Sequence, residues 1–194
     1  MQDLLAKHKA SDFIPARIMQ ALKKCSTDTK PMQHAFKYLN SNKTFLVMTG
    51  KVGTGKTVAA YWAGLQIMER GITTAYGITI TDDMPPFKAI KAFDLIDIAI
   101  NNQAEFERLK TSYFLVLDEL GGESYKNIEY WHSMLDRFFD YRYEHCLKTI
   151  IISNLNFTEI TKRYPERMID RLKGDSMVVN ITGASLRGAS NDTN

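Results

Sequence analysis

Residues 50–57 combine glycines, a lysine and a hydroxyl group in the spacing of a phosphate-binding loop. They read Gly50-Lys51-Val52-Gly53-Thr54-Gly55-Lys56-Thr57 and fit the pattern G-x-x-x-x-G-K-[ST] at every fixed position. In this pattern, successive backbone N–H groups face a phosphate, and the following helix adds the positive end of its dipole. Lys56 would reach the β- and γ-phosphates and Thr57 would hold Mg²⁺. The motif therefore predicts a site for a nucleoside triphosphate with Mg²⁺.

Two acidic residues, Asp118 and Glu119, follow the apolar run 113–117. Carboxylates at the C-terminal end of a buried parallel strand lie on the edge where open α/β sheets bind ligands. We therefore expect Asp118 to hold Mg²⁺ beside Thr57, and Glu119 to orient and polarise an attacking water. Two solvated acids at a strand end are the alternative, which the preceding glycine motif makes the weaker one.

Two further positions are compatible with this site. The apolar run 149–152 ends in Ser153-Asn154, so the Asn154 amide is expected beside Asp118, within reach of a γ-phosphate or the attacking water. Taken alone, Asn154 would be interpreted as a turn former. Near the N-terminus, Ile14 precedes Pro15 and is compatible with an apolar wall beside a nucleotide base. A bare helix start explains it equally well.

Apolar runs of strand length alternate with helical patterns along the chain. The predicted strands are 44–49, 72–80, 113–117, 149–152 and 177–181, and the predicted helices after the glycine motif are 58–70, 87–101, 105–110, 128–145, 157–164 and 166–173. Residues 1–43 predict a helical lead-in, and 121–124 a flexible turn. This alternation favours an α/β fold with a parallel sheet covered by helices on both faces.

Composition limits the class of protein. The 194 residues suffice for one domain, and 44% hydrophobic with 24% charged residues is ordinary for a globular protein. No apolar run approaches the roughly 18 residues of a membrane span, so we expect a cytoplasmic protein with no membrane partner. The two cysteines are interpreted as reduced thiols. A net charge of +3 permits contact with nucleic acid without arguing for it.

Several motifs, in this order, resemble the AAA+ ATPases of the DnaC/IstB-like group, which comprises helicase-loader and transposition ATPases. The resemblance covers about residues 13–188. It is carried by 50–57, by Phe-Leu-Val-Leu-Asp-Glu-Leu at 114–120, by 139–144, by 149–155, by Glu-Arg-Met-Ile-Asp-Arg-Leu at 166–172 and by Ser-Leu-Arg at 185–187. It implies a P-loop NTPase with a five-stranded parallel sheet and a minimal or absent C-terminal lid. The implied division is a lead-in at 1–40, an ATPase domain at 41–188 and a flexible tail at 189–194.

The resemblance also implies roles for four positions. Asn154 matches sensor 1, Arg187 matches the sensor 2 arginine, and Arg171 matches the arginine finger that reaches a neighbouring subunit's ATP, with Arg167 as its substitute. A guanidinium there would stabilise the charge that develops during phosphoryl transfer. Arg167 and Arg171 are also four residues apart, as on any solvated helix face.

The implied partners are a hexameric replicative helicase, single-stranded DNA, and further copies of the chain in a ring or spiral. DNA would contact an inserted helical segment at 86–110 through Lys88 and Lys91, although a solvated helix face explains these lysines equally well. Only about a dozen residues precede the region of resemblance, where helicase loaders carry a helicase-docking segment. An IstB-like transposition helper ATPase and an ATP-switch regulatory module are the alternatives. The minimal size is compatible with a phage-encoded protein.

Overall fold

A five-stranded parallel sheet forms the centre of the molecule. The computed structural model describes residues 14–70, 87–123 and 128–186. The strands are β1 (Phe45–Thr49), β2 (Phe87–Lys91), β3 (Phe114–Leu120), β4 (Lys148–Ser153) and β5 (Ser176–Asn180). Their order is β2-β3-β4-β1-β5, and every neighbouring pair is parallel. The predicted α/β fold with a five-stranded parallel sheet is confirmed.

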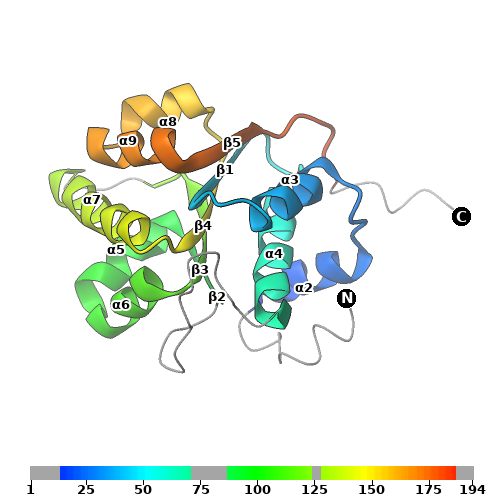
Figure 1. Cartoon of the computed structure of the whole chain (residues 1–194), viewed down its shortest axis with the longest axis horizontal. Coiled ribbons are helices and arrows are strands. Elements are labelled where there is room, and N and C mark those ends of the chain that lie inside the picture. Colours follow the sequence, from blue (N-terminus) through cyan, green and yellow to red (C-terminus); the bar gives the residue numbers. More distant parts are fainter. Residues whose placement is uncertain (1–13, 71–86, 124–127, 187–194) are drawn as a thin grey trace, which may run out of the picture.

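Helices cover both faces of this sheet (Figure 1). On one face lie α2 (Ala16–Lys24), α3 (Lys30–Leu39) and α4 (Lys56–Arg70). On the other lie α5 (Ala92–Asn101), α6 (Gln103–Thr111), α7 (Ile128–Glu144), α8 (Phe157–Arg163) and α9 (Glu166–Asp175). Within the described ranges, no helix is long and apolar enough to cross a membrane.

Side-chain alternation along β1 divides the apolar core into two halves. Leu46 and Met48 pack with α2, α3 and α4, whereas Phe45 and Val47 pack with α7 and the other helices of the opposite face. Successive residues of a strand point to opposite faces, so a strand buried on both sides is a near-continuous apolar run. All five residues of β1 are buried, as this requires.

The prediction of one helix over 87–101 is wrong for its first five residues. Phe87–Lys91 form the edge strand β2, which pairs in register with β3 so that Lys91 lies opposite Asp118. The Phe87 ring packs edge-on against Phe114 and Tyr61, with ring centres 5.9 and 5.8 Å apart. Pairing with a buried neighbour strand therefore outweighs the local helical pattern, and the helix begins only at Ala92.

The remaining predicted elements within the described residues are confirmed, with ends shifted by a few positions. The predicted strand at 72–80 lies outside the described residues, as does the tail at 189–194. The domain boundaries at 40 and 188 stay predictions.

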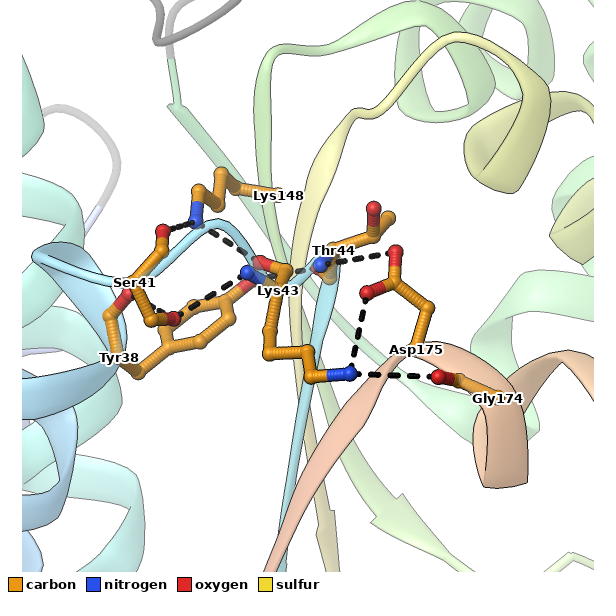
Figure 2. Close-up of polar contacts among 7 residues, drawn as sticks. All are labelled: Tyr38, Ser41, Lys43, Thr44, Lys148, Gly174 and Asp175. Carbon is orange, nitrogen blue, oxygen red and sulfur yellow. Dashed lines mark hydrogen bonds and ion pairs between the residues drawn. The ribbon is translucent and has the colours of Figure 1, made fainter.

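Lys148 anchors the start of β4 at the sheet edge opposite the glycine loop (Figure 2). Its ammonium group donates to the backbone carbonyls of Ser41 and Lys43, at 2.7 and 2.8 Å, and lies 4.7 Å from the centre of the Tyr38 ring. The Tyr38 hydroxyl donates to the carbonyl of Thr44 at 2.6 Å. Burial lowers the pKa of Lys148 to about 8. These contacts hold the α3–β1 connection against β4.

Asp175, at the end of α9, joins the same group of contacts (Figure 2). Its carboxylate accepts a hydrogen bond from the Thr44 backbone N–H at 3.3 Å and lies 3.7 Å from the Lys43 ammonium. Lys43 also donates to the carbonyl of Gly174 at 3.2 Å. The end of α9 is thereby attached to the start of β1, so α9 is fixed relative to the strand that carries the glycine loop.

Arg142 is a fully buried cation on α7. Its guanidinium donates to the carbonyls of Leu109, Lys110 and Ser112 at 2.9–3.1 Å and to that of Lys148 at 2.9 Å. Burial lowers its pKa to about 9. Arg142 thus connects the end of α6 to the starts of β3 and β4.

Candidate nucleotide site

The glycine loop connects β1 directly to α4, as the motif requires. Gly50 has φ of 127°, and a Cβ at this position would lie 2.2 Å from the carbonyl oxygen of Ile181. The segment that follows β5 contacts the end of β1 and the loop: Ile181 N–H donates to the carbonyl of Thr49 and Leu186 N–H donates to that of Gly53, each at 2.8 Å. Only glycine fits at position 50, because φ is positive and the backbone of Ile181, just after β5, lies against it.

Lys56, the first residue of α4, is 5% exposed and bends back over the loop. Its ammonium group donates to the carbonyls of Gly50 and Lys51 at 2.7 and 2.8 Å. Thr54 is buried and donates to the Lys51 carbonyl at 3.0 Å, whereas Val52 is exposed. A cation and the N-terminus of a 15-residue helix therefore face the same loop, which is where an anion would bind.

Thr57 and Asp118 meet, although they are far apart in the sequence. The Thr57 hydroxyl donates to one carboxylate oxygen of Asp118 at 2.9 Å, and the other oxygen accepts the backbone N–H of Glu119 at 2.8 Å. Burial raises the pKa of Asp118 above its ordinary value, and the bond from Thr57 opposes this. A hydroxyl and a carboxylate are oxygen donors of the kind Mg²⁺ takes from proteins, with substrate phosphates and waters completing its shell. The pair therefore fits a Mg²⁺ ion.

Glu119 has an unusual backbone and a cationic partner. Its φ is 58°, uncommon for a residue with a side chain, and its carboxylate lies 3.2 Å from the Lys91 ammonium. Both side chains are about half exposed, at 45% and 49%. Lys91 can reach Glu119 because it ends β2 opposite Asp118. The sequence suggested Lys91 only as a DNA contact on a helix. Because residues 87–91 were predicted to be helical, the position of Lys91 at this site could not be predicted.

Glu123 holds the turn after β3, which the sequence predicted to be flexible. Its side chain is 1% exposed and accepts the Gly121 backbone N–H at 2.7 Å. The same carboxylate contacts the Tyr164 hydroxyl, and its backbone carbonyl contacts the guanidinium of Arg163. The turn is thereby attached to the end of α8, which stabilises the backbone next to Glu119. The only signal in the sequence was an acidic residue after two glycines.

Asn154 lies at the same sheet edge as Asp118. It directly follows β4, whose last residue, Ser153, is paired with Leu120 of β3, and it is exposed. Its proposed contact with phosphate or water stays a prediction. Ile14 is 4% exposed and packs in the core shared by α2, α3 and α4, so its role beside a base also stays a prediction. Arg187 lies outside the described residues.

The two arginines of α9 share one carboxylate on α7. Arg171 forms an ion pair with Asp140 and is 18% exposed, whereas Arg167 pairs with the same carboxylate at 3.2 Å and is 66% exposed. The Arg171 guanidinium also lies 5.6 Å from the centre of the Tyr143 ring. An open cavity of about 440 Å³ adjoins it. The cavity is lined by Tyr143, Asp170, Arg171, Lys173 and Gly174. Sequence reasoning missed Asp140, because nothing local links it to a helix 27 residues later.

Known proteins resemble this chain in family and in fold. A family model described as IstB-like ATP binding protein matches residues 22–193. No curated protein matched the chain. Two solved structures match over most of both chains: the DnaC helicase loader at TM-score 0.64 and 17% identity, covering 87% of this chain and 100% of that one, and DnaI at TM-score 0.62 and 18% identity, covering 89% and 94%.

A third structure is a replication initiator, DnaA, bound to AMPPCP and single-stranded DNA. Its TM-score is 0.56 at 18% identity over 86% of this chain, and the chain spans 44% of its length. At these identities the solved structures establish a shared fold, the P-loop α/β fold of AAA+ proteins. The family model covers most of the chain and agrees with the sequence motifs and the site's geometry. The chain belongs to the IstB-like ATP-binding protein family.

Proposed function

We propose that this protein is an ATP-hydrolysing accessory protein of DNA replication that acts like a helicase loader. The observation that carries the ATPase part is the 2.9 Å hydrogen bond between Thr57 and Asp118 beside the glycine loop, with Glu119 as the next residue. A protein that only binds ATP has no need of a second carboxylate beside the metal ligand. The presence of Glu119 at this edge therefore favours hydrolysis over a pure nucleotide switch.

Each residue of the site has a separate task in this proposal. The loop N–H groups and the Lys56 ammonium bind the β- and γ-phosphates. Thr57 and Asp118 would hold Mg²⁺, which supplies positive charge to the phosphate oxygens when bound. Glu119 accepts a hydrogen bond from the attacking water and orients it toward the γ-phosphate. Asn154 donates from the neighbouring strand end to that water or to the phosphate, and Arg187 contacts the γ-phosphate.

Hydrolysis is tested with the Glu119→Gln variant. It should bind ATP as the wild type does and hydrolyse it at least about 100-fold more slowly, the usual effect of losing a general base. Lys56→Ala should instead lose ATP binding. The matched control is Glu129→Gln, which removes an exposed carboxylate at the start of α7. Wild-type turnover by the Glu119→Gln variant would leave only the nucleotide-switch function.

Assembly of several copies of the chain would involve the arginines of α9. We propose that Arg171 reaches the ATP of a neighbouring subunit in a ring or spiral, with Arg167 as its substitute. In the single chain Arg171 is already paired with Asp140, so a neighbour's phosphate would have to compete with that carboxylate. Mixing Arg171→Ala subunits with Lys56→Ala subunits should restore part of the activity, because some interfaces regain both groups. Absence of recovery at every mixing ratio would refute action in trans.

The partners are proposed from the neighbours' names. Loading would involve a hexameric replicative helicase and single-stranded DNA, as DnaC is a helicase loader and one DnaA structure contains single-stranded DNA. A second candidate is a transposition helper ATPase with a transposase as partner, because the chain belongs to the IstB-like family and the DnaC/IstB-like group that its motifs resemble includes transposition ATPases. Co-purification of the tagged chain with the replicative helicase and, separately, with a transposase from the same genome separates them. Retention of the transposase alone would reject the loader proposal.

A further inference from the structure

Positive charge is concentrated in the part of the chain that precedes β1. Residues 14–43 contain six lysines and arginines and one aspartate, a net charge of +5, whereas the whole chain carries +3 and the remainder therefore −2. This segment forms α2 and α3, which pack on α4 and not on the helices of the opposite face. The charge thus lies on one side of the molecule (Figure 1).

Each of the two helices turns one polar, basic side outward. At 100° per residue, the exposed residues of α2 and those of α3 each fall within about a third of a turn. These residues, called here the α2–α3 basic face, are Arg17, Gln20, Lys23 and Lys24 on α2 and Lys30, Gln33, Phe36 and Lys37 on α3. The spacing is the same in both helices. The inward sides bury Leu22 of α2, and Met32, Ala35 and Tyr38 of α3.

The cations of the α2–α3 basic face differ from Lys88 and Lys91, which have acidic partners. Within the described ranges, no salt bridge involves Arg17, Lys23, Lys24, Lys30 or Lys37. The positive charge of two of these lysines also affects the titration of a neighbouring histidine. The pKa of His34 is lowered, first by its partial burial and then by the charges of Lys37 and Lys30. Several cations on one surface, with no acidic partner in the part of the chain that the structure describes, are suited to binding a polyanion.

Lys88 and Lys91, which the sequence suggested as DNA contacts, are already engaged. Lys88 lies 3.0 Å from Glu105, and Lys91 lies 3.2 Å from Glu119. A phosphate would have to displace a carboxylate at either position, whereas no carboxylate of the described residues is paired with a cation of the α2–α3 basic face.

Phe36 indicates which class of polyanion would bind to this face. It is a large hydrophobic residue that is 51% exposed among the lysines of α3. An exposed aromatic ring beside cations can stack on an unpaired base while the cations bind the phosphates, and duplex DNA offers no such base. Arg17 and Lys24 are seven residues apart, as are Lys30 and Lys37. That is about 10 Å along each helix, the length of about three nucleotides in one strand of B-form DNA.

We propose that the α2–α3 basic face binds single-stranded nucleic acid, with its lysines and Arg17 on the phosphates and Phe36 stacked on a base. This proposal adds a binding surface to the DNA role of the proposed function, and it rests on that function for its biological context. The binding itself needs neither ATP hydrolysis nor Arg171.

The test measures binding of a fluorescent oligothymidylate of about 20 nucleotides to the full chain by anisotropy. Changing Lys23, Lys24 and Lys37 to Gln should weaken binding about 100-fold at 0.1 M salt and reduce the slope of log K against log salt by about 2, since each lost contact with a single strand removes about 0.7. The control changes Arg108, Arg137 and Lys162 to Gln. It removes the same charge from exposed positions on α6, α7 and α8 and should leave the slope unchanged.

Phe36→Leu separates stacking from charge. It should weaken binding about 5- to 150-fold and leave the salt slope unchanged, because no phosphate contact is lost. Equal losses in the lysine variant and its control would overturn the assignment of the face. Binding to vesicles of phosphatidylserine and phosphatidylcholine, or to the helicase, without binding to the oligonucleotide would reassign it to a membrane or a protein partner.

The proposed ATPase function is tested independently with the same proteins. A fluorescent ATP analogue should bind the lysine variant, Phe36→Leu and wild type equally. If Lys56→Ala still bound the analogue, the nucleotide site would be wrong, and the oligonucleotide results would stand.

Discussion

The ion pair between Lys91 and Glu119 is expected to restrain ATP hydrolysis. The carboxylate that is proposed to orient the attacking water is held 3.2 Å from an ammonium group at the end of β2. While it is paired there, its oxygen is less available to a water molecule. Lys91→Met removes the charge and keeps an unbranched side chain, so it should increase the turnover of ATP.

The structure sets the size of this increase. Both side chains are about half exposed, and ion pairs of this kind contribute about 0.2–1 kcal/mol. That free energy corresponds to a factor of about 1.4–5 in the ratio of paired to released Glu119. Turnover at saturating ATP should therefore rise by no more than about 5-fold. The increase should shrink at high salt, because exposed pairs are screened.

The assay is steady-state phosphate release at saturating Mg·ATP, with ATP affinity measured separately. Lys88→Met is the matched control, since it removes a lysine from the same strand whose partner, Glu105, lies on α6. It should leave turnover unchanged. A fall of ten-fold or more in Lys91→Met would refute the reasoning and identify Lys91 as a group that assists the reaction. An unchanged rate would show that the pair does not limit hydrolysis.

Three further predictions concern charged groups that are buried or partly buried. Arg142→Met should lower the free energy of unfolding by about 3–5 kcal/mol in urea titrations, because the buried backbone carbonyls that accept its hydrogen bonds lose their donor. The control is Arg137→Met, at an exposed position on the same helix, which should change this free energy by less than about 0.5 kcal/mol. The pKa of Lys148 is about 8 in the folded state against an ordinary value of 10.5, so the unfolded chain binds more protons between these pH values. The stability of wild type relative to Lys148→Met should therefore increase as pH rises from 8 to 10, and a flat or falling difference would contradict the lowered pKa. Because burial raises the pKa of Asp118, Mg²⁺-dependent ATP binding should weaken with acidification at a higher pH than an ordinary aspartate would give, an effect that Asp118→Asn should abolish.

The local parts of the nucleotide site could be predicted because their signals are short in sequence. Residues 50–57 form a loop between a strand and a helix wherever they occur, since the glycines and the lysine act within eight residues. Asp118 was found for a similar reason, as it ends an apolar run that must be a buried strand. The hydrogen bond between Asp118 and Thr57 then followed from the common edge at which parallel strands end.

The partners of the functional side chains could not be predicted in this way. Lys91 pairs with Glu119 only because residues 87–91 form an edge strand, and a helical pattern at these positions gave the opposite expectation. Asp140 meets Arg171 only because α7 packs beside α9. Each contact joins two segments that are far apart in the sequence, and no local sequence pattern indicates that they meet.

The sequence by itself determined the α/β class, the phosphate-binding loop and the acidic strand end, because each depends on hydrophobic period or on motif spacing within a few residues. Only the tertiary structure decided the strand order β2-β3-β4-β1-β5, the ion pair between Lys91 and Glu119, the carboxylate shared by the two arginines of α9, and the common side for the cations of α2 and α3. The physical reason is that these features depend on which surfaces pack together, and packing is a property of the whole chain.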